Sequence, residues 1–194
     1  MKTLILDTST NLLYISFVED NKVIYEVKSM GLNNHSDHLL DLIKKGLDEN
    51  NLQVKDFDRI ILGKGPGAYT GLRVSMSVAK MFSWTLNIPL YTISSLDLLT
   101  SGYEEDVLYL IKFKAKKGYI YHKAFVIENK IKKLLTDEMF VNDEFIDTYE
   151  KNNFKEVNII TNDLYNVDVL KIKDEELQLV DNVHALEPNY LREC

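Results

Sequence analysis

Glycine is concentrated in one short stretch, where residues 63–71 read Gly-Lys-Gly-Pro-Gly-Ala-Tyr-Thr-Gly and hold four of the chain's eight glycines. Glycine adopts positive φ at little cost and has no Cβ, so such a loop can turn sharply and come close to another surface. An apolar segment precedes the loop and a helical pattern follows it, and Thr70 is predicted to cap that helix. The free amides at a helix start can hold a phosphate or a carboxylate. A purely structural turn is the alternative.

The spacing of these glycines matches neither of the two common nucleotide-binding loops. A Walker loop ends in Gly-Lys-Ser/Thr, whereas Gly71 is followed by Leu72 and Arg73. The dinucleotide fingerprint requires a third glycine three residues after the second, within a βαβ unit, and both are missing here. Spacing alone therefore favours the structural turn over an anion site.

The sequence gives little support for a metal site or for a catalytic nucleophile. His35 and His38 are three residues apart, but a zinc site needs further ligands, and neither a cysteine nor a suitably spaced third histidine is near. His122 and His184 are isolated, and no Ser-His-Asp or Cys-His grouping can be assembled. We predict no metal site and no catalytic nucleophile.

Composition indicates a folded protein with an acidic surface. The 194 residues are 45% hydrophobic and can bury a core, in one large or two small domains. A single cysteine, Cys194, precludes an internal disulfide and suits a reducing compartment. The first apolar run is too short for a signal peptide, and no segment approaches the length of a membrane span. We expect a soluble cytoplasmic protein without a membrane partner.

The charge balance bears on nucleic-acid binding. A net charge of −7 argues against a protein that grips nucleic acid through a broad basic face of its own. One local basic run could still contact RNA phosphate and stack on a base, although a solvated strand face is the favoured reading. It comprises Lys112, Lys114, Lys116 and Lys117, followed by Tyr119 and Tyr121.

The elements that would position these residues occur twice in the same order: three strands, a helix and a strand. In the first half we predict strands at 2–6, 12–18, 23–27, 59–62 and 90–93, with helices at 36–50, 71–86 and from 95. In the second half we predict strands at 107–113, 119–127, 131–135 and 157–161, a helix at 143–151, and final β-prone runs at 167–172 and 177–180. This order predicts an α/β fold of two ribonuclease-H-like halves, 1–102 and 103–194, of which the second is reduced.

The predicted helix 71–86 is apolar on nearly every side. Leu72, Met76 and Ala79 share one side, while Val74 and Met81 lie on another. Such a helix is buried on more than one side. Leaving three of its large side chains in water would cost about 1.5–3 kcal/mol each. Either the domain itself or another subunit must cover this helix.

Residues 63–73 closely resemble the signature Gly-x-Gly-Pro-Gly-Ser-Phe-Thr-Gly-[Val/Leu]-Arg of the TsaB (YeaZ) family. Weaker matches are Ile5-Leu6-Asp7-Thr8-Ser9, His35-Ser36 followed by Leu39-Leu40, and Pro188-Asn189-Tyr190-Leu191-Arg192. The resemblance implies a fold of the actin, Hsp70 and sugar-kinase (ASKHA) type. It also implies a non-catalytic partner of a TsaD subunit in threonylcarbamoyladenosine synthesis on tRNA.

Nucleotide-handling relatives of this fold place a carboxylate at the end of the first strand, where this chain has Asp7. Asp-Thr-Ser turns at strand ends are also common without such a role. The candidate nucleotide or anion site, without a resident cofactor, comprises Asp7, Thr8, Ser9, Gly65, Gly67, Thr70 and Gly71.

The second half departs from the family pattern. Where TsaB and TsaD proteins usually show Asp-Ala-Arg-x-Gly, residues 114–118 read Lys-Ala-Lys-Lys-Gly. Lysine in place of the aspartate removes a metal ligand, which argues against independent ATP hydrolysis.

The resemblance further implies that the first two helices contact the partner. The predicted interface residues are Leu39, Leu42, Ile43, Leu47, Leu72, Met76, Ala79, Lys80 and Ser83. A TsaE-like ATPase and tRNA would be met only through the complex, and a homodimer could use the same surface. Two alternatives remain open, a stand-alone ASKHA-type ATPase or small-molecule kinase that uses Asp7, and a plain self-associating protein.

Overall fold

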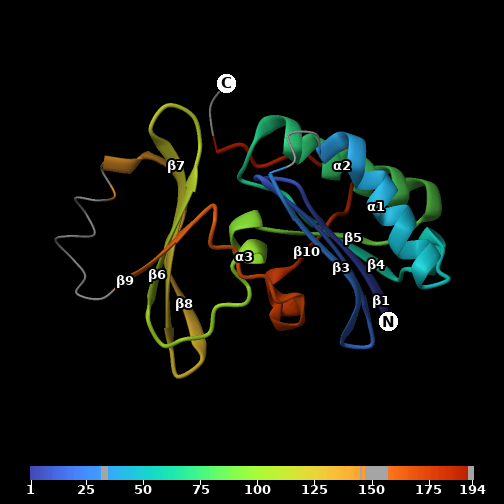
Figure 1. Cartoon of the computed structure of the whole chain (residues 1–194), viewed down its shortest axis with the longest axis horizontal. Helices are drawn as coiled ribbons and strands as arrows, with labels where there is room; N and C mark the ends of the chain where they lie inside the picture. The colour runs from blue at the N-terminus through green and yellow to red at the C-terminus, as the bar shows by residue number, and fades with distance from the viewer. Residues whose placement is uncertain (32–34, 145, 147–156, 192–194) are drawn as a thin grey trace.

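The structure is a computed structural model that describes residues 1–31, 35–144, 146 and 157–191. Two β-sheets stand side by side, with helices outside the larger sheet and a short helix between the sheets (Figure 1). No helix in the described ranges is both long and apolar enough to cross a membrane.

The larger sheet, sheet A, has the strand order β10-β5-β4-β1-β2-β3. An antiparallel meander of β1, β2 and β3 comes first, and β4 and β5 extend the sheet parallel to β1. The bounds are β1 Lys2–Asp7, β2 Leu12–Glu19, β3 Lys22–Met30, β4 Arg59–Gly63 and β5 Leu90–Ile93. Helices α1 (His35–Glu49) and α2 (Tyr69–Leu86) cover one face (Figure 1). The turn η1 (Val54–Asp56) leads into β4.

The smaller sheet, sheet B, repeats the first four strands of this topology. Its order is β8-β7-β6-β9, with a meander of β6, β7 and β8, and with β9 parallel to β6. The bounds are β6 Leu108–Lys114, β7 Tyr119–Glu128, β8 Ile131–Asn142 and β9 Val157–Thr161. The predicted fold of two ribonuclease-H-like units with a reduced second unit is confirmed. The helix predicted at 143–151 falls largely outside the described residues.

The core follows the strand alternation. Leu4 and Leu6 of β1 pack under α1 and α2, whereas Ile5 faces the opposite side of sheet A. On that side lie α3 (Ser95–Leu99) and the inner face of sheet B, which contributes Tyr109 and Phe125. The central strands β1 and β4 are therefore buried on both faces, as their apolar sequences require.

The C-terminal segment returns to the first half, which corrects our assignment of all of 103–194 to the second. The β-prone run at 167–172 forms no strand and contains the 3-10 turn η2 (Val169–Lys171), and a further turn, η3 (Asp174–Glu176), follows it. Strand β10 (Gln178–Leu179) then pairs antiparallel with β5 of sheet A. Val183 and Leu186 pack against the core beneath the helices.

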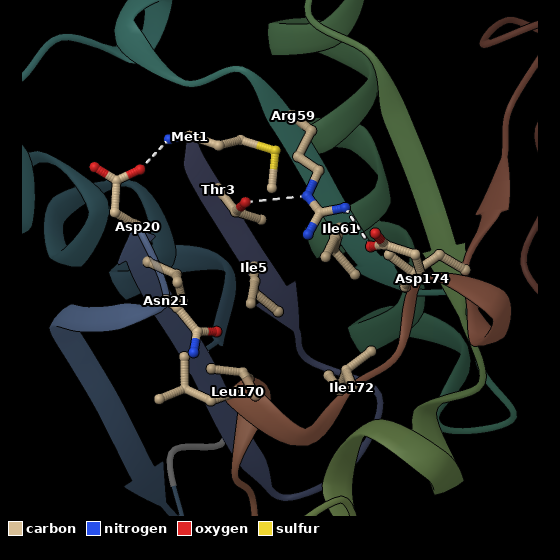
Figure 2. A pocket seen from close by; sticks show the side chains of 13 residues that line it. Met1, Thr3, Ile5, Asp20, Asn21, Arg59, Ile61, Leu170, Ile172 and Asp174 are labelled. Atoms are coloured by element: carbon tan, nitrogen blue, oxygen red, sulfur yellow. Dashed lines mark hydrogen bonds and ion pairs between the residues drawn. The ribbon is translucent and has the colours of Figure 1, made fainter.

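The turns η2 and η3 leave a pocket of about 290 Å³ against the starting edge of β1 and β4. In Figure 2 the Arg59 side chain lies across it: Nε donates to Thr3 Oγ1 at 3.1 Å and Nη1 to Asp174 at 2.7 Å. These bonds tie the C-terminal excursion to sheet A. The pocket opens at the end of the sheet opposite the glycine loop.

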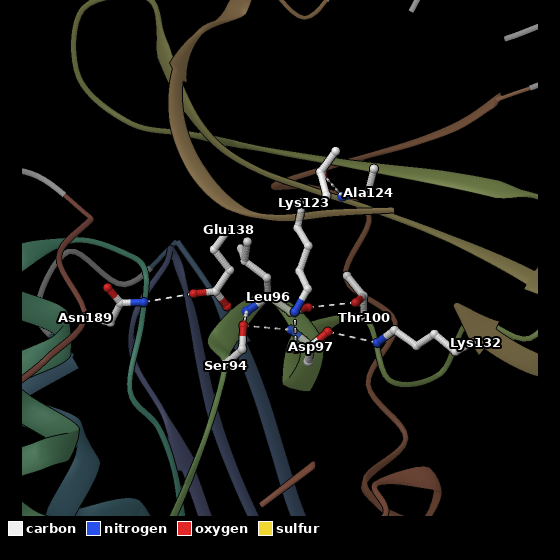
Figure 3. Close-up of polar contacts among 10 residues, drawn as sticks. Ser94, Leu96, Asp97, Thr100, Lys123, Ala124, Lys132, Glu138 and Asn189 are labelled. Carbon is white, nitrogen blue, oxygen red and sulfur yellow. Dashed lines mark hydrogen bonds and ion pairs between the residues drawn. The ribbon is translucent and has the colours of Figure 1, made fainter. Parts of the chain in front are cut away.

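A cluster of charges around the partly buried Asp97 joins α3 to sheet B. Asp97 accepts bonds from Lys123 on β7 and from Lys132 on β8, the latter at 2.8 Å (Figure 3). Burial by itself would raise the pKa of Asp97, but the two lysines outweigh it and hold the pKa below its usual value. Nearby, Asn189 Nδ2 donates to Glu138 at 2.8 Å, so the C-terminal segment also contacts sheet B.

Replacing Asp97 by Asn should destabilise the protein, because two lysines would lose their shared carboxylate while the shape of the side chain is kept. We expect a loss of about 3 kcal/mol in the free energy of unfolding, measured by urea denaturation. The matched control is Lys133→Gln, which breaks an exposed pair with Glu128 and should cost less than about 1 kcal/mol. Equal losses in the two variants would contradict a special role for the Asp97 cluster.

Candidate functional site

The glycine loop joins β4 to α2 and lies directly against the end of β1. The Ala68 N–H donates to the Ser9 carbonyl oxygen at 2.7 Å, and the Gly65 N–H donates to Ser95 Oγ at 3.0 Å. Two of the loop's amides are thus already used within the chain.

Thr8 makes the most unusual contact of this region. Its hydroxyl donates to the Gly71 carbonyl oxygen at 2.6 Å and accepts from the Ser75 N–H at 3.2 Å. In a regular helix the Ser75 amide would bond to the Gly71 carbonyl itself. The Thr8 side chain is therefore inserted into the first turn of α2, and it fixes that helix to the end of β1.

Close packing explains why glycine is needed in the loop. A Cβ on Gly71 would lie 2.0 Å from the Thr8 carbonyl oxygen, and one on Gly67 would lie 2.3 Å from the carbonyl oxygen of Ser9. Gly65 has φ of +110°, and a Cβ there would meet the Asn189 carbonyl oxygen at 2.4 Å. The surface that the loop approaches is the chain's own backbone.

The prediction that Thr70 caps α2 is wrong. The helix begins at Tyr69, its N-cap is Ala68, and no side chain caps it. Thr70 is exposed and faces solvent at the first turn. The sequence offered no local signal for the actual contact, because Thr8 reaches the helix from 63 residues away.

Asp7 is fully buried beside the loop. Its Oδ1 accepts the Ser9 N–H at 2.7 Å, and a Cβ on Gly63 would lie 1.8 Å from its Oδ2. Burial raises the pKa of Asp7 to about 6, although hydrogen bonds from Ser9 and Ser95 oppose the shift. The second oxygen, Oδ2, lies against Gly63 and has no hydrogen-bond partner among the described residues.

A cleft of about 860 Å³ separates the glycine loop from sheet B. Tyr121 OH donates to the Gly67 carbonyl oxygen at 2.9 Å, and Tyr165 OH donates to Asn11 Oδ1 at 2.6 Å. Of the predicted anion-site residues, the cleft is lined by Ser9, Gly67, Thr70 and Gly71, whereas Asp7, Thr8 and Gly65 are packed behind it.

The cleft does not fit a magnesium nucleotide of the kind that the fold can hold. Lys114 lines the cleft at the position where the family resemblance implies a second carboxylate. The Asp7 side chain is fully buried and does not line the cleft. Within the described residues no three His, Cys, Asp or Glu side chains are grouped so as to hold a metal ion.

The predicted interface residues face inward for the most part, which corrects their assignment. Leu42 and Leu47 are half-buried against the same core, and Lys80 donates to the carbonyl oxygens of His184 and Leu186. A partner cannot reach the side chains that are buried in the chain's own core, namely Leu39, Ile43, Leu72, Met76, Ala79 and Ser83.

The outer sides of the same helices do carry exposed apolar side chains, which we call the α1/α2 face. The exposed fractions are 48% for Leu40, 50% for Tyr69, 45% for Met81, 64% for Trp84 and 41% for Leu86. A groove of about 440 Å³ runs between the two helices beside Leu40 and Tyr69. Helical periodicity alone could not decide which apolar side faces the sheet, since both are apolar.

Comparison with known proteins places the chain in a family. The model of the family described as TsaD, tRNA N6-adenosine threonylcarbamoyltransferase, matches residues 29–156, more than half of the chain. The tRNA threonylcarbamoyladenosine biosynthesis protein TsaB of Bacillus subtilis is 32% identical over 130 residues, covering 66% of this chain and 57% of that protein. The chain belongs to the TsaB (YeaZ) family.

Further TsaB relatives agree. TsaB of Buchnera aphidicola subsp. Schizaphis graminum is 31% identical over 136 residues, covering 68% of this chain and 64% of that protein. The chain thus matches less than two thirds of the length of either relative.

Solved structures of TsaB (YeaZ) type share the fold. YeaZ from Pseudomonas aeruginosa superposes with a TM-score of 0.65 at 23% identity, covering 73% of this chain and 69% of that one. An uncharacterized protein with similarity to peptidase YeaZ from Pseudomonas aeruginosa superposes with a TM-score of 0.81 at 20% identity, covering 98% and 99%.

Gly71→Ala tests whether this TsaB-type loop is glycine-rich for packing. At an exposed helix position alanine would stabilise by up to about 1 kcal/mol relative to glycine. Here the new Cβ would meet the Thr8 backbone, so we expect a loss of about 2–3 kcal/mol in urea denaturation. Ser77→Ala on the exposed side of α2 is the control and should change stability by less than about 0.5 kcal/mol. A more stable Gly71→Ala variant would contradict the packing argument.

Asp7→Asn tests the buried carboxylate through pH. Below the unfolded pKa of 3.8 both states carry the proton, so the folded protein bears no cost of a buried charge. As the pH rises through the folded pKa of about 6, that cost appears in full. The variant keeps an acceptor for the Ser9 N–H and avoids the charge. Its stability relative to wild type should rise by up to about 3 kcal/mol between pH 4 and pH 7, in urea titrations.

The control for this experiment is Asp181→Asn, which removes an exposed carboxylate and should follow the wild-type pH profile. A pH-independent difference between Asp7→Asn and wild type would show that Asp7 is not a buried acid of raised pKa.

Proposed function

We propose that the chain is a cytoplasmic, non-catalytic subunit that serves threonylcarbamoyladenosine formation on tRNA and docks onto a TsaD-like catalytic subunit through the α1/α2 face. Support for the pathway comes from the names of its TsaB relatives. The chain matches only part of the length of these relatives, so its role in the same pathway is part of this proposal.

The exposed apolar side chains of α1 and α2 are the observation that carries the docking proposal. Trp84 is the chain's single tryptophan, and it is the most exposed of its large apolar side chains on described residues. Large aromatic side chains at the centre of an interface supply much of its binding energy. A stable contact of this kind buries on the order of 1,600 Å² in total.

A non-catalytic role is supported by the state of the two acidic positions. Asp7 is enclosed by backbone, and lysine occupies the position of the second carboxylate at residue 114. Neither position provides a ligand for a metal-bound phosphate. In our proposal a TsaE-like ATPase and the tRNA substrate meet this chain only as members of the complex.

A homodimer could form through the same face. Because one face cannot contact two partners at once, self-association and TsaD binding would compete. We therefore propose that the isolated chain forms a homodimer and that the heterodimer with the TsaD-like subunit is the functional state.

Co-purification with a TsaD-like protein tests the proposal. Trp84→Asp combined with Met81→Asp puts two charges on the α1/α2 face without touching the core, and it should reduce recovery of the complex at least about tenfold. The matched control is Ile131→Asp, an exposed apolar residue of β8 on the other half, which should leave recovery unchanged. Circular dichroism would confirm that both variants fold. A complex undisturbed by the double variant would refute docking through this face.

A further inference from the structure

Three exposed lysines are held on one tight turn between β6 and β7, which we call the lysine turn (Lys114, Lys116 and Lys117). The Tyr119 N–H donates to the Lys116 carbonyl oxygen at 3.2 Å. Lys117 and Gly118 have φ of 56° and 77°, as the two central residues of a type I′ turn do. The backbone of this turn is thereby fixed.

Further bonds anchor the lysine turn to its surroundings. The Ala115 N–H donates to the Tyr119 carbonyl oxygen at 2.9 Å, and the Lys114 N–H donates to Asn162 Oδ1 at 2.5 Å. An added Cβ on Gly118 would meet nothing within 4 Å, so the tip of the turn projects into solvent. The lysines are thus presented from a rigid base.

The charge of the lysine turn is local in an otherwise acidic chain. Lys114 and Lys116 line the cleft, and the one exposed acidic residue among the described residues that line it is Asp163. The whole chain has a net charge of −7, so the positive charge on this wall of the cleft is opposite in sign to the net charge of the protein. A polyanion would be attracted here and repelled by most of the remaining surface.

A partly exposed tyrosine, Tyr119, lies beside the lysines. It stacks on Phe140 with centroids 4.8 Å apart and planes 6° from parallel. Cations beside a ring that is held in place yet still accessible are what single-stranded nucleic acid binds, through phosphates and base stacking.

We propose that the lysine turn and Tyr119 contact the sugar–phosphate backbone and bases of a single-stranded RNA loop. This inference rests on the proposed function only for the identity of that RNA as tRNA. Three lysine contacts on a single strand correspond to a slope of about −2 in a plot of log affinity against log salt concentration. The contact is weak alone and adds to the affinity of the complex.

The test is fluorescence anisotropy of a labelled RNA hairpin with an unpaired loop, titrated with the full chain at low salt. The variant combines Lys114→Gln, Lys116→Gln and Lys117→Asn, because asparagine tolerates the positive φ at position 117. We expect at least about a tenfold loss of affinity and a salt slope that is smaller by about 2.

The matched control removes the same charge elsewhere, with Lys22→Gln, Lys55→Gln and Lys130→Asn. Lys130 also has positive φ, 63°, in the turn at the opposite end of the ten-residue strand β7. Figure 1 shows the β2–β3 hairpin, which holds Lys22, at the end of its sheet away from the β6–β7 turn. The control should stay within about twofold of wild type, because distant exposed charges are screened.

Equal losses in the two triple variants, or no RNA binding by the wild-type chain at low salt, would overturn the proposal. Displacement of RNA by pyrophosphate at equal phosphate concentration would also overturn it, since the site would then prefer a free polyphosphate. Co-purification of each variant with a TsaD-like protein is measured in a separate experiment. A lysine-turn variant that keeps its partner and loses RNA supports the inference, whereas a wild-type chain that binds RNA but does not co-purify with a TsaD-like protein would refute only the proposed function.

Discussion

The structure depends on one hydrogen-bonded insertion, that of the Thr8 hydroxyl into the first turn of α2. It requires the end of β1, the glycine loop and the helix start to touch backbone to backbone, and only glycine at residues 67 and 71 leaves the space. With α2 fixed in this way, Leu72 and Met76 point into the core and the opposite side of the helix points outward. The apolar outer face therefore follows from a contact that also encloses Asp7.

Polar contacts in several places hold the two halves together. Asp97 joins α3 to sheet B through two lysines, and Tyr121 reaches across to the glycine loop. The Tyr121 bond to the Gly67 carbonyl oxygen ties the two walls of the cleft directly to each other.

Much of the fold could be predicted from the sequence, because strands such as 12–18 and 90–93 are apolar and bounded by turns, and because their order repeats. The outward side of α2 could not, since Val74, Met76 and Met81 differ little in hydrophobicity and only the sheet decides which are buried. Thr8 was recognised as a candidate for the wrong reason: its position near Asp7 suggested phosphate, while its partners lie 63 residues away. The β-prone run at 177–180 contains β10, but its pairing with β5 could not be predicted, because so short a strand carries no signal of its partner.

That pairing has a consequence for how the protein is made. Strand β10 and residues 180–190 complete the edge of sheet A and occupy one flank of α2, through Lys80 and Tyr190 among others. A ribosome delivers these residues last of all the described chain, so the first half remains unfinished throughout synthesis of the second. Sheet A therefore cannot gain its last edge strand until residues 178–179 have been synthesised.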